Sequence, residues 1–372
     1  MHGTKILTET DRLMTVCNSC RYCEGLCAVF PAMEMRRAFT DGDLNYLANL
    51  CHGCGACYVD CQFSPPHEFN VNVPQTLAIA RAESYAAYAW PRATSGLFAR
   101  NGLLLSLIAA FSVAAFIFGF AATHDRQALT VAHTGPGAFY VLMPHNAMAA
   151  LFGAAFLFAI LALAMSLRAF WLDIGDPVAK VGSAGSLWQA IRDAGSLRYL
   201  DGGGVGCFNA DDQPTDRRRL YHHLTFYGFL LCFAATSAAT LYHYLLAREA
   251  PYPWWDLPVV LGTLGGIGLV IGTIGLLVAK WRRDPVLVDR ARYGMDSAFT
   301  IMLLLTATTG LALLIWRDGA AMGAWLAIHL GFVFALFITL PYSKFVHGLY
   351  RFAALVRYAR ERRMMAGGSV SE

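Results

Sequence analysis

Eight of the ten cysteines form two copies of one motif near the start of the chain. In each copy, gaps of two, two and three residues separate the cysteines. This is the ligand spacing of ferredoxins that hold two cubane clusters, because three closely spaced thiolates bind one cluster and the fourth reaches the other. The spacing therefore predicts two [4Fe-4S] clusters, one held by Cys17, Cys20, Cys23 and Cys61 and the other by Cys51, Cys54, Cys57 and Cys27.

Structural zinc is the alternative for such a segment, but zinc usually takes its ligands as two separated CxxC pairs. The polar first residues, MHGTKILTETDRLM, lack the apolar core of a signal peptide. This favours a location in the reducing cytoplasm, and metal binding by the cysteines over disulfide formation.

Leu44, Leu47 and Leu50 fall at helical intervals between the motifs, so an α-helical ferredoxin is expected rather than the β-containing type. Cys207 and Cys232 are expected to be a loop thiol and a packed membrane residue.

Histidines later in the chain lie at spacings suited to haem. His329 and His347 are 18 residues apart, which is five turns of a continuous helix, so both would point the same way about 27 Å apart. On an earlier apolar segment, His243 is about 60° out of phase with His222 and about 160° with His223. The phase favours His222 as a ligand, with His223 as its neighbour or as an alternate ligand.

The composition predicts that lipid surrounds much of the chain. Hydrophobic residues make up 56% of the 372 residues, charged residues make up 15%, and the mean hydropathy is +0.45. Only helices satisfy their own backbone in lipid, and about 20 residues cross the bilayer core. Six apolar segments have about this length: 97–122, 144–167, 220–247, 257–280, 297–316 and 321–343.

Basic residues concentrate on one side of these segments. The connections opposite to the termini offer only Arg126, Arg248 and Arg317, whereas the other side carries many more, including the run at 217–219 and the C-terminal tail. By the positive-inside rule, both termini are cytoplasmic and the protein lies in the inner (cytoplasmic) membrane. The net charge of +4 is too small to indicate a nucleic-acid partner.

This orientation puts the histidines at matching depths. His243 and His329 fall in the outer half of the membrane, while His222 and His347 fall near the cytoplasmic face. Because the axial ligands of one haem face each other at equal depth, the prediction is one b haem between each pair. A lone membrane histidine is more often a packing residue, and His145 is interpreted as an interfacial one.

The expected organisation has three parts. They are a two-cluster iron–sulfur domain at 1–92, a six-helix membrane haem b domain at 93–350 and a basic cytoplasmic tail at 351–372. The long connection at 173–219 should contain a short helix, Leu187–Leu200, and its glycine cluster DGGGVG is interpreted as a plain loop, since no strand precedes it. The four-residue glycine spacing in LGTLGGIGLVIGTIG predicts close contact between two membrane helices.

The last apolar segment, HLGFVFALFITLPYSKFVH, resembles the haem-binding helix of respiratory nitrate reductase gamma subunits. The resemblance covers about 220–350 and implies haem ligation by His329 and His347 and chemistry with quinol. On the third apolar segment the histidine spacing differs from that family. The partner ligands there rest on helical geometry alone.

Over nearly the whole chain, CRYCEGLCAVFPA, CHGCGACYVDCQFSPPHEFNVNVP and RRRLYHHLTFYGFLLCFAATSAATLYHYL are similar to the tricarballylate (citrate) utilization protein B family. The family implies a soluble FAD-dependent tricarballylate dehydrogenase as partner, whose reduced flavin is reoxidised through this protein. This chain has no flavin fingerprint and no acid/base constellation for dehydrogenating a substrate.

The sequence thus predicts a membrane electron carrier from a flavoprotein, through two clusters and haem b, to the quinone pool. The flavoprotein is expected to dock beside the basic connection bearing Lys180, Arg192 and Arg198. One alternative is the same apparatus with another partner, as in heterodisulfide-reductase-like or quinol-oxidising enzymes. The other is a membrane redox sensor without turnover.

Overall fold

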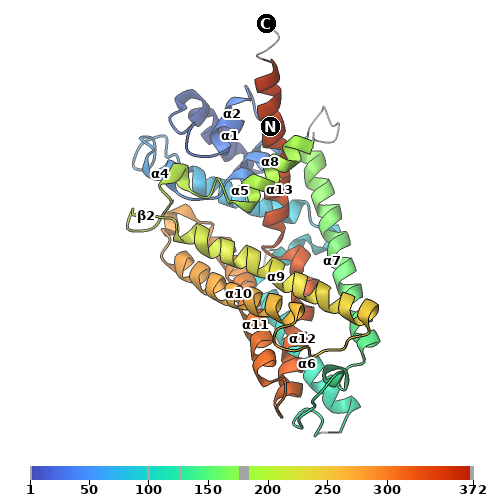
Figure 1. Ribbon diagram of the computed structural model, residues 1–372. Helices are drawn as coiled ribbons and strands as arrows, with labels where there is room; N and C mark the ends of the chain where they lie inside the picture. Colours follow the sequence, from blue (N-terminus) through green and yellow to red (C-terminus); the bar gives the residue numbers. More distant parts are fainter. Residues whose placement is uncertain (1, 99–100, 126, 176–183, 369–372) are drawn as a thin grey trace.

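The computed structural model describes residues 2–98, 101–125, 127–175 and 184–368 (Figure 1). In these residues the only strands are β1 (Cys207–Phe208) and β2 (Pro214–Thr215), which pair as one antiparallel hairpin. All longer elements are helices. The predicted mostly helical class is confirmed.

The cysteine-rich part consists of helices joined by turns. Its helices are α1 (Lys5–Cys20), α2 (Val29–Glu34), α3 (Asp41–Leu50), α4 (Ala56–Val59) and α5 (Val73–Ala87). A capping box of Thr40 and Asp43 starts α3, and the helix ends where Cys51 adopts an extended backbone. Leu44, Leu47 and Leu50 are buried, as their helical spacing predicts.

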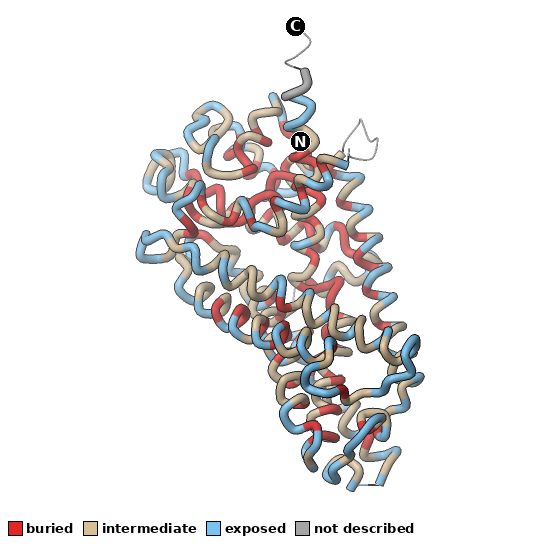
Figure 2. Tube along the Cα trace, viewed as in Figure 1, coloured by how far each residue is buried: buried red, intermediate tan, exposed pale blue. Residues whose placement is uncertain are grey.

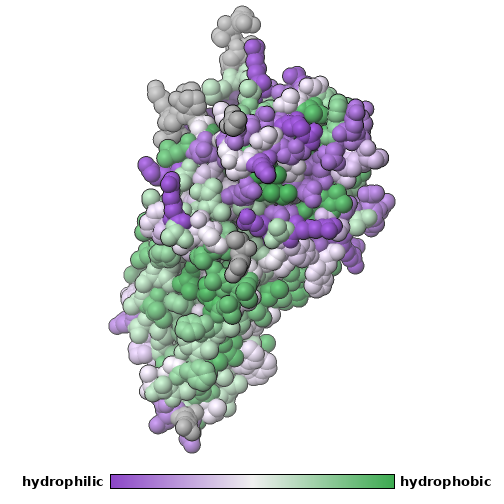
Figure 3. Space-filling view, turned by 180° about the vertical axis from the view of Figure 1, so that it is seen from behind, coloured by the Kyte–Doolittle hydropathy of each residue, from purple (hydrophilic) through white to green (hydrophobic). Residues whose placement is uncertain are grey.

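Six helices are long and apolar enough to cross a membrane, as predicted. They are α6 (Asn101–Thr123), α7 (His145–Ile174), α9 (Arg217–Leu246), α10 (Leu257–Trp281), α11 (Tyr293–Trp316) and α12 (Met322–Thr339). The other elements are α8 (Ala184–Gly195), α13 (Val346–Gly368) and the 3-10 turns η1 (Arg92–Phe98), η2 (Ala138–Tyr140), η3 (Gly202–Gly204), η4 (Pro285–Leu287), η5 (Arg290–Arg292) and η6 (Leu340–Tyr342). In Figure 3 a hydrophobic region covers the membrane helices and a hydrophilic surface covers the cysteine-rich end.

The last apolar segment is not one continuous helix. α12 ends at Thr339, η6 follows, and Ser343 has an extended backbone before α13 begins at Val346. Pro341 has no N–H to donate and its ring clashes with a helical turn, so it interrupts the helix. The count of five unbroken turns between His329 and His347 is therefore wrong, and His347 lies on α13.

Glycines let α9 and α10 pack almost backbone to backbone. A Cβ on Gly265 would lie 2.8 Å from the carbonyl oxygen of Gly228, and one on Gly272 would lie 2.7 Å from the nitrogen of Thr225. Gly266 instead faces Leu311 of α11. The predicted close helix contact is confirmed.

The C-terminal helix is part of the folded core rather than a separate tail. α13 packs against α3, α7 and α8, and one core of buried side chains runs from Leu13 and Leu47 to Tyr350 and Leu355. Figure 2 shows this burial concentrated at the cysteine-rich end. The six candidate membrane helices show less burial, as expected for helices whose outer faces contact lipid.

An ionic network joins α13 to the cysteine-rich helices. Arg36 contacts Asp43 at 2.7 Å and Glu361 at 2.5 Å, and Arg357 contacts Asp43 at 2.9 Å and Glu361 at 2.8 Å. The hydroxyl of Tyr46 also donates to Glu361 at 2.9 Å. Each charge therefore has two opposite partners, which offsets the cost of partial burial.

Glu361→Ala should lower the free energy of unfolding by about 3 kcal/mol, because the guanidiniums of Arg36 and Arg357 each lose a partner.

The stability of this network should also depend on pH. Burial alone would raise the pKa of Asp43, but hydrogen bonds from Arg36 and Thr40 outweigh this effect and lower that pKa. The contribution of Asp43 is therefore complete above pH about 4 and lost as the pH falls through its folded-state pKa. Thermal unfolding in detergent at several pH values measures both effects. Glu68→Gln, at an exposed position, is the control.

Candidate functional site

The first set of thiols lies where α1 ends. Cys17 and Cys20 occupy its last turn, and Arg21, with a left-handed φ of 56°, turns the chain out of the helix. Burial and the nearby thiols of Cys23, Cys61 and Cys20 raise the pKa of Cys17 to about 12. Burial, with Cys61 and Cys20 alongside, also raises the pKa of Cys23 to about 12. The structure thus brings together the four thiols predicted to share one cluster.

The second set gathers around the start of α4. Burial raises the pKa of Cys54 to about 11, and Cys207 and Cys51 lie near its sulfur. Burial also raises the pKa of Cys27, whose thiol neighbours are Cys54 and Cys51, and the pKa of Cys57, which has the same two neighbours and Cys27. Cys27 therefore crosses from the first motif to the second set, as the spacing predicts. Cys207, expected to be a loop thiol, is buried beside this set.

These thiols resist deprotonation, first because burial disfavours the charged thiolate and second because neighbouring thiolates would repel one another. Iron in a cluster offsets this repulsion, so the donor chemistry fits two cubane clusters. In the described ranges, no three His, Cys, Asp or Glu side chains converge closely enough to hold a single metal ion. Ligation by these eight cysteines remains a prediction.

The glycine cluster after α8 packs over both cysteine loops. A Cβ on Gly202 would lie 3.9 Å from the sulfur of Cys54, and one on Gly203 would lie 3.0 Å from a methyl group of Leu26. Both glycines have left-handed φ values, 58° and 79°. The amide of Phe208 then donates to the carbonyl of Cys54 at 2.8 Å. This segment is a loop, as predicted, but sequence reasoning missed its place against the cysteines.

His222 of α9 and His347 of α13 face each other at the end of the membrane helices nearest the cysteines. Their ring centroids are 6.0 Å apart and their planes are inclined by 74°. An imidazole nitrogen binds a metal at about 2 Å, so one iron between two rings needs a centroid separation of about 6 Å. Nδ1 of His347 bonds to the carbonyl of Lys344, which leaves Nε2 for a metal. The pair fits a bis-histidine haem.

The other candidate histidines are placed differently. His223 packs 5.9 Å from the ring of Tyr227. His243 stacks on His145 with ring centroids 3.4 Å apart, too close for an iron between them. Nδ1 of His329 lies 3.1 Å from the hydroxyl of Thr309. The structure records no ring contact between His243 and His329 in its described part, so the outer haem remains a prediction.

His52 links the second thiol set to the histidine pair. It is buried, and its Nδ1 lies 3.0 Å from the carbonyl oxygen of Leu50. Burial and the nearby Arg351 and His222 lower its pKa well below the usual range. His52 stands between Cys51 and Cys54 in the sequence and beside His222 in space. The sequence signalled its nearness to the cysteines but not its nearness to His222.

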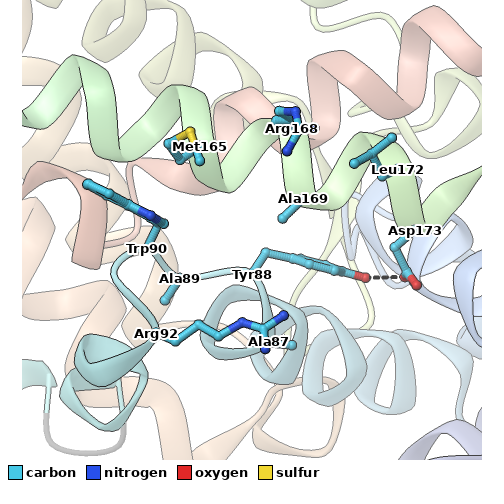
Figure 4. Close-up of a pocket in the computed structure, with 10 residues that line it drawn as sticks. All are labelled: Ala87, Tyr88, Ala89, Trp90, Arg92, Met165, Arg168, Ala169, Leu172 and Asp173. Atoms are coloured by element: carbon cyan, nitrogen blue, oxygen red, sulfur yellow. Dashed lines mark hydrogen bonds between the residues drawn. The ribbon is translucent and has the colours of Figure 1, made fainter.

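A separate cleft of about 460 Å³ lies between the end of α5 and α7 (Figure 4). Its lining includes Trp90, Arg92 and Arg168, and the hydroxyl of Tyr88 donates to Asp173 at one end. None of the predicted cysteine or histidine ligands lines it. The cleft is therefore distinct from the thiol sets and the histidine pair.

The first thiol set lies nearer the solvent than the second. Tyr22, between Cys20 and Cys23, is 72% exposed, whereas Cys51 and His52 are buried.

Two of the three basic residues of the predicted docking connection are exposed. These are Arg192 and Arg198, and Arg198 lies 3.4 Å from Asp193. Lys180 lies outside the described residues.

Family models and a similar protein together match nearly the whole chain. The family model for citrate utilization protein B matches residues 97–368, and the model for the Fer4-like domain of citrate utilization protein B matches residues 10–87. Citrate utilization protein B of Escherichia coli is 48% identical over 367 residues, which cover 96% of this chain and 94% of that protein. No solved structure is significantly similar. With a Fer4-like domain and six candidate membrane helices, the chain belongs to the citrate utilization protein B family.

Proposed function

We propose that this protein carries electrons from a soluble flavoprotein to the quinone pool of the inner membrane. The first thiol set is the entry, the second set is the exit, and the His222–His347 pair is the first membrane site. The clusters and haem b supply one-electron steps, and the chain sets their spacing. Both termini then lie in the cytoplasm.

One observation supports this proposal above the others. His52 stands between Cys51 and Cys54 of the second thiol set and lies beside His222, whose ring is 6.0 Å from that of His347. The fold thus brings the end of one predicted cofactor domain to the start of the other. A redox sensor without turnover does not need so short a distance between its iron–sulfur and haem sites.

The family resemblance suggests the partner. It implies a FAD-dependent dehydrogenase of the tricarballylate type, whose reduced flavin needs an electron acceptor. The similar protein from Escherichia coli is named for citrate utilization, which agrees with a tricarboxylate as the substrate oxidised upstream. This chain is proposed to carry no dehydrogenating site of its own.

Purified protein should couple oxidation of the reduced flavoprotein to reduction of a short-chain quinone under anaerobic conditions. Quinol formation is followed optically, with flavoprotein alone and carrier alone as controls. Quinone reduction by dithionite-reduced carrier but not by this flavoprotein would point to another partner. Absence of quinone reduction from either donor, with cofactors intact, would favour the sensor.

A further inference from the structure

Four arginines from separate segments converge on one short stretch of backbone, 48–53, between the second thiol set and the His222–His347 pair. Arg81 of α5 donates to the carbonyls of Cys51 and Ala48, the latter at 3.5 Å. Arg351 of α13 donates to the carbonyl of Cys51 at 2.8 Å. This set is called the arginine cage and consists of Arg81, Arg218, Arg283 and Arg351.

The other two members hold the next residues of the same stretch. Arg218 of α9 donates to the carbonyl of Gly53 at 2.9 Å and to that of His52 at 3.3 Å. Arg283, just after α10, also donates to the carbonyl of Gly53. Gly53 has a left-handed φ of 58°, and a Cβ there would lie 3.1 Å from a guanidinium nitrogen of Arg283, so a side chain at this position would be strained and crowded. The cage therefore ties α9, the end of α10 and α13 to the cysteine-rich part.

The cage concentrates positive charge without a matching carboxylate. In the described residues, none of its arginines forms an ion pair. Asp296, whose charge acts on Arg81, is paired with Lys344 at 2.8 Å. All four arginines are half-buried, and carbonyl dipoles only partly offset charges removed from water. A site of this kind favours anionic ligands.

Two cage members flank the histidine pair. Arg218 precedes His222 by four residues on α9, and Arg351 follows His347 by four residues on α13. Residues four apart lie on one helix face, about 6 Å apart along the axis. The backbone positions of both arginines therefore lie one helical turn from a histidine of the pair, and both guanidiniums donate to the cysteine-rich part. Arg218 and Arg351 would therefore be placed to hold the carboxylates of a haem bound by the two histidines.

We propose that the arginine cage binds the propionate carboxylates of the inner haem and orients its propionate edge towards the second thiol set. This inference rests on the proposed haem between His222 and His347. Bidentate guanidinium–carboxylate bonds would fix the rotation of the macrocycle about its axial ligands, which the two histidines alone leave open. The cage then positions the cofactor edge through which electrons enter.

Binding of a haem without its carboxylates tests the cage. Haem-free full-length protein in detergent is titrated with iron protoporphyrin IX and with its dimethyl ester, and the Soret band reports binding. The wild type should prefer the free acid by about tenfold to a hundredfold, as expected for one or two charged hydrogen bonds. The double variant Arg218→Gln, Arg351→Gln should lose this preference while still binding the ester.

Arg282→Gln is the matched control, since Arg282 is an exposed neighbour of Arg283; it should keep the preference. Iron content and cluster EPR signals show whether each variant is folded. Equal wild-type affinity for the two haems, or a preference that survives in the double variant, would overturn the cage while leaving the proposed function in place. Failure of the wild type to bind either haem would contradict both the cage proposal and the haem step of the proposed function.

Discussion

His222→Ala and His347→Ala should each abolish the inner haem completely, because a bis-histidine iron loses one of its two protein ligands. The ring separation of 6.0 Å supports a shared iron. Haem content is measured as the pyridine haemochrome per protein, and the low-spin EPR signal of the inner haem should disappear in both variants. Cluster signals should persist, since the eight predicted cysteine ligands are untouched.

His223→Ala is the matched control one residue away. The ring of His223 packs beside Tyr227 and forms no ring contact with His347 in the described part of the chain. This variant should therefore keep the inner haem. If it loses the haem while His222→Ala retains it, the assignment of the ligand on α9 is wrong.

Cys54→Ser should remove one cluster and disconnect the haem from its electron source. Cys54 belongs to the second set, next to His52, so its cluster is the proposed exit. Cys20→Ser should remove the other cluster and spare this one. Purified wild type should hold about eight iron atoms in clusters, and each variant should lose one of two EPR signals on reduction.

The two cysteine variants separate the iron–sulfur hypothesis from zinc. Two zinc ions and no reducible centre in anaerobically purified wild type would contradict the cluster assignment. Loss of both EPR signals in a variant that remains folded by thermal unfolding would show that the two sets are not independent. Cys232→Ser, distant from both sets on α9, should change neither signal.

Local spacing was enough to predict much of this fold. The cysteine pattern predicted which thiols meet, including the crossing of Cys27 and Cys61, because the motif encodes a local loop geometry. Hydropathy predicted the six helices that are long and apolar enough to cross a membrane, because a bilayer demands about 20 apolar residues per crossing. Both signals depend on short stretches of sequence.

Contacts between distant segments could not be predicted in this way. Arg351 meets the carbonyl of Cys51 across 300 residues, and no periodicity connects two such positions. The stacking of His145 on His243 depends on how α7 and α9 pack. The helix count from His329 to His347 is wrong because Pro341 interrupts the helix between them.

The central measurement is rapid anaerobic mixing of the reduced flavoprotein with oxidised carrier, with cluster and haem b absorbance followed together. In the wild type, cluster bleaching should precede haem reduction, and added quinone should then reoxidise the haem. In Cys54→Ser the haem should stay oxidised, or be reduced at least about a hundredfold more slowly, while the first cluster still accepts electrons. Haem reduction at the wild-type rate in Cys54→Ser, or none in the wild type with all cofactors present, would contradict an electron path through the second thiol set.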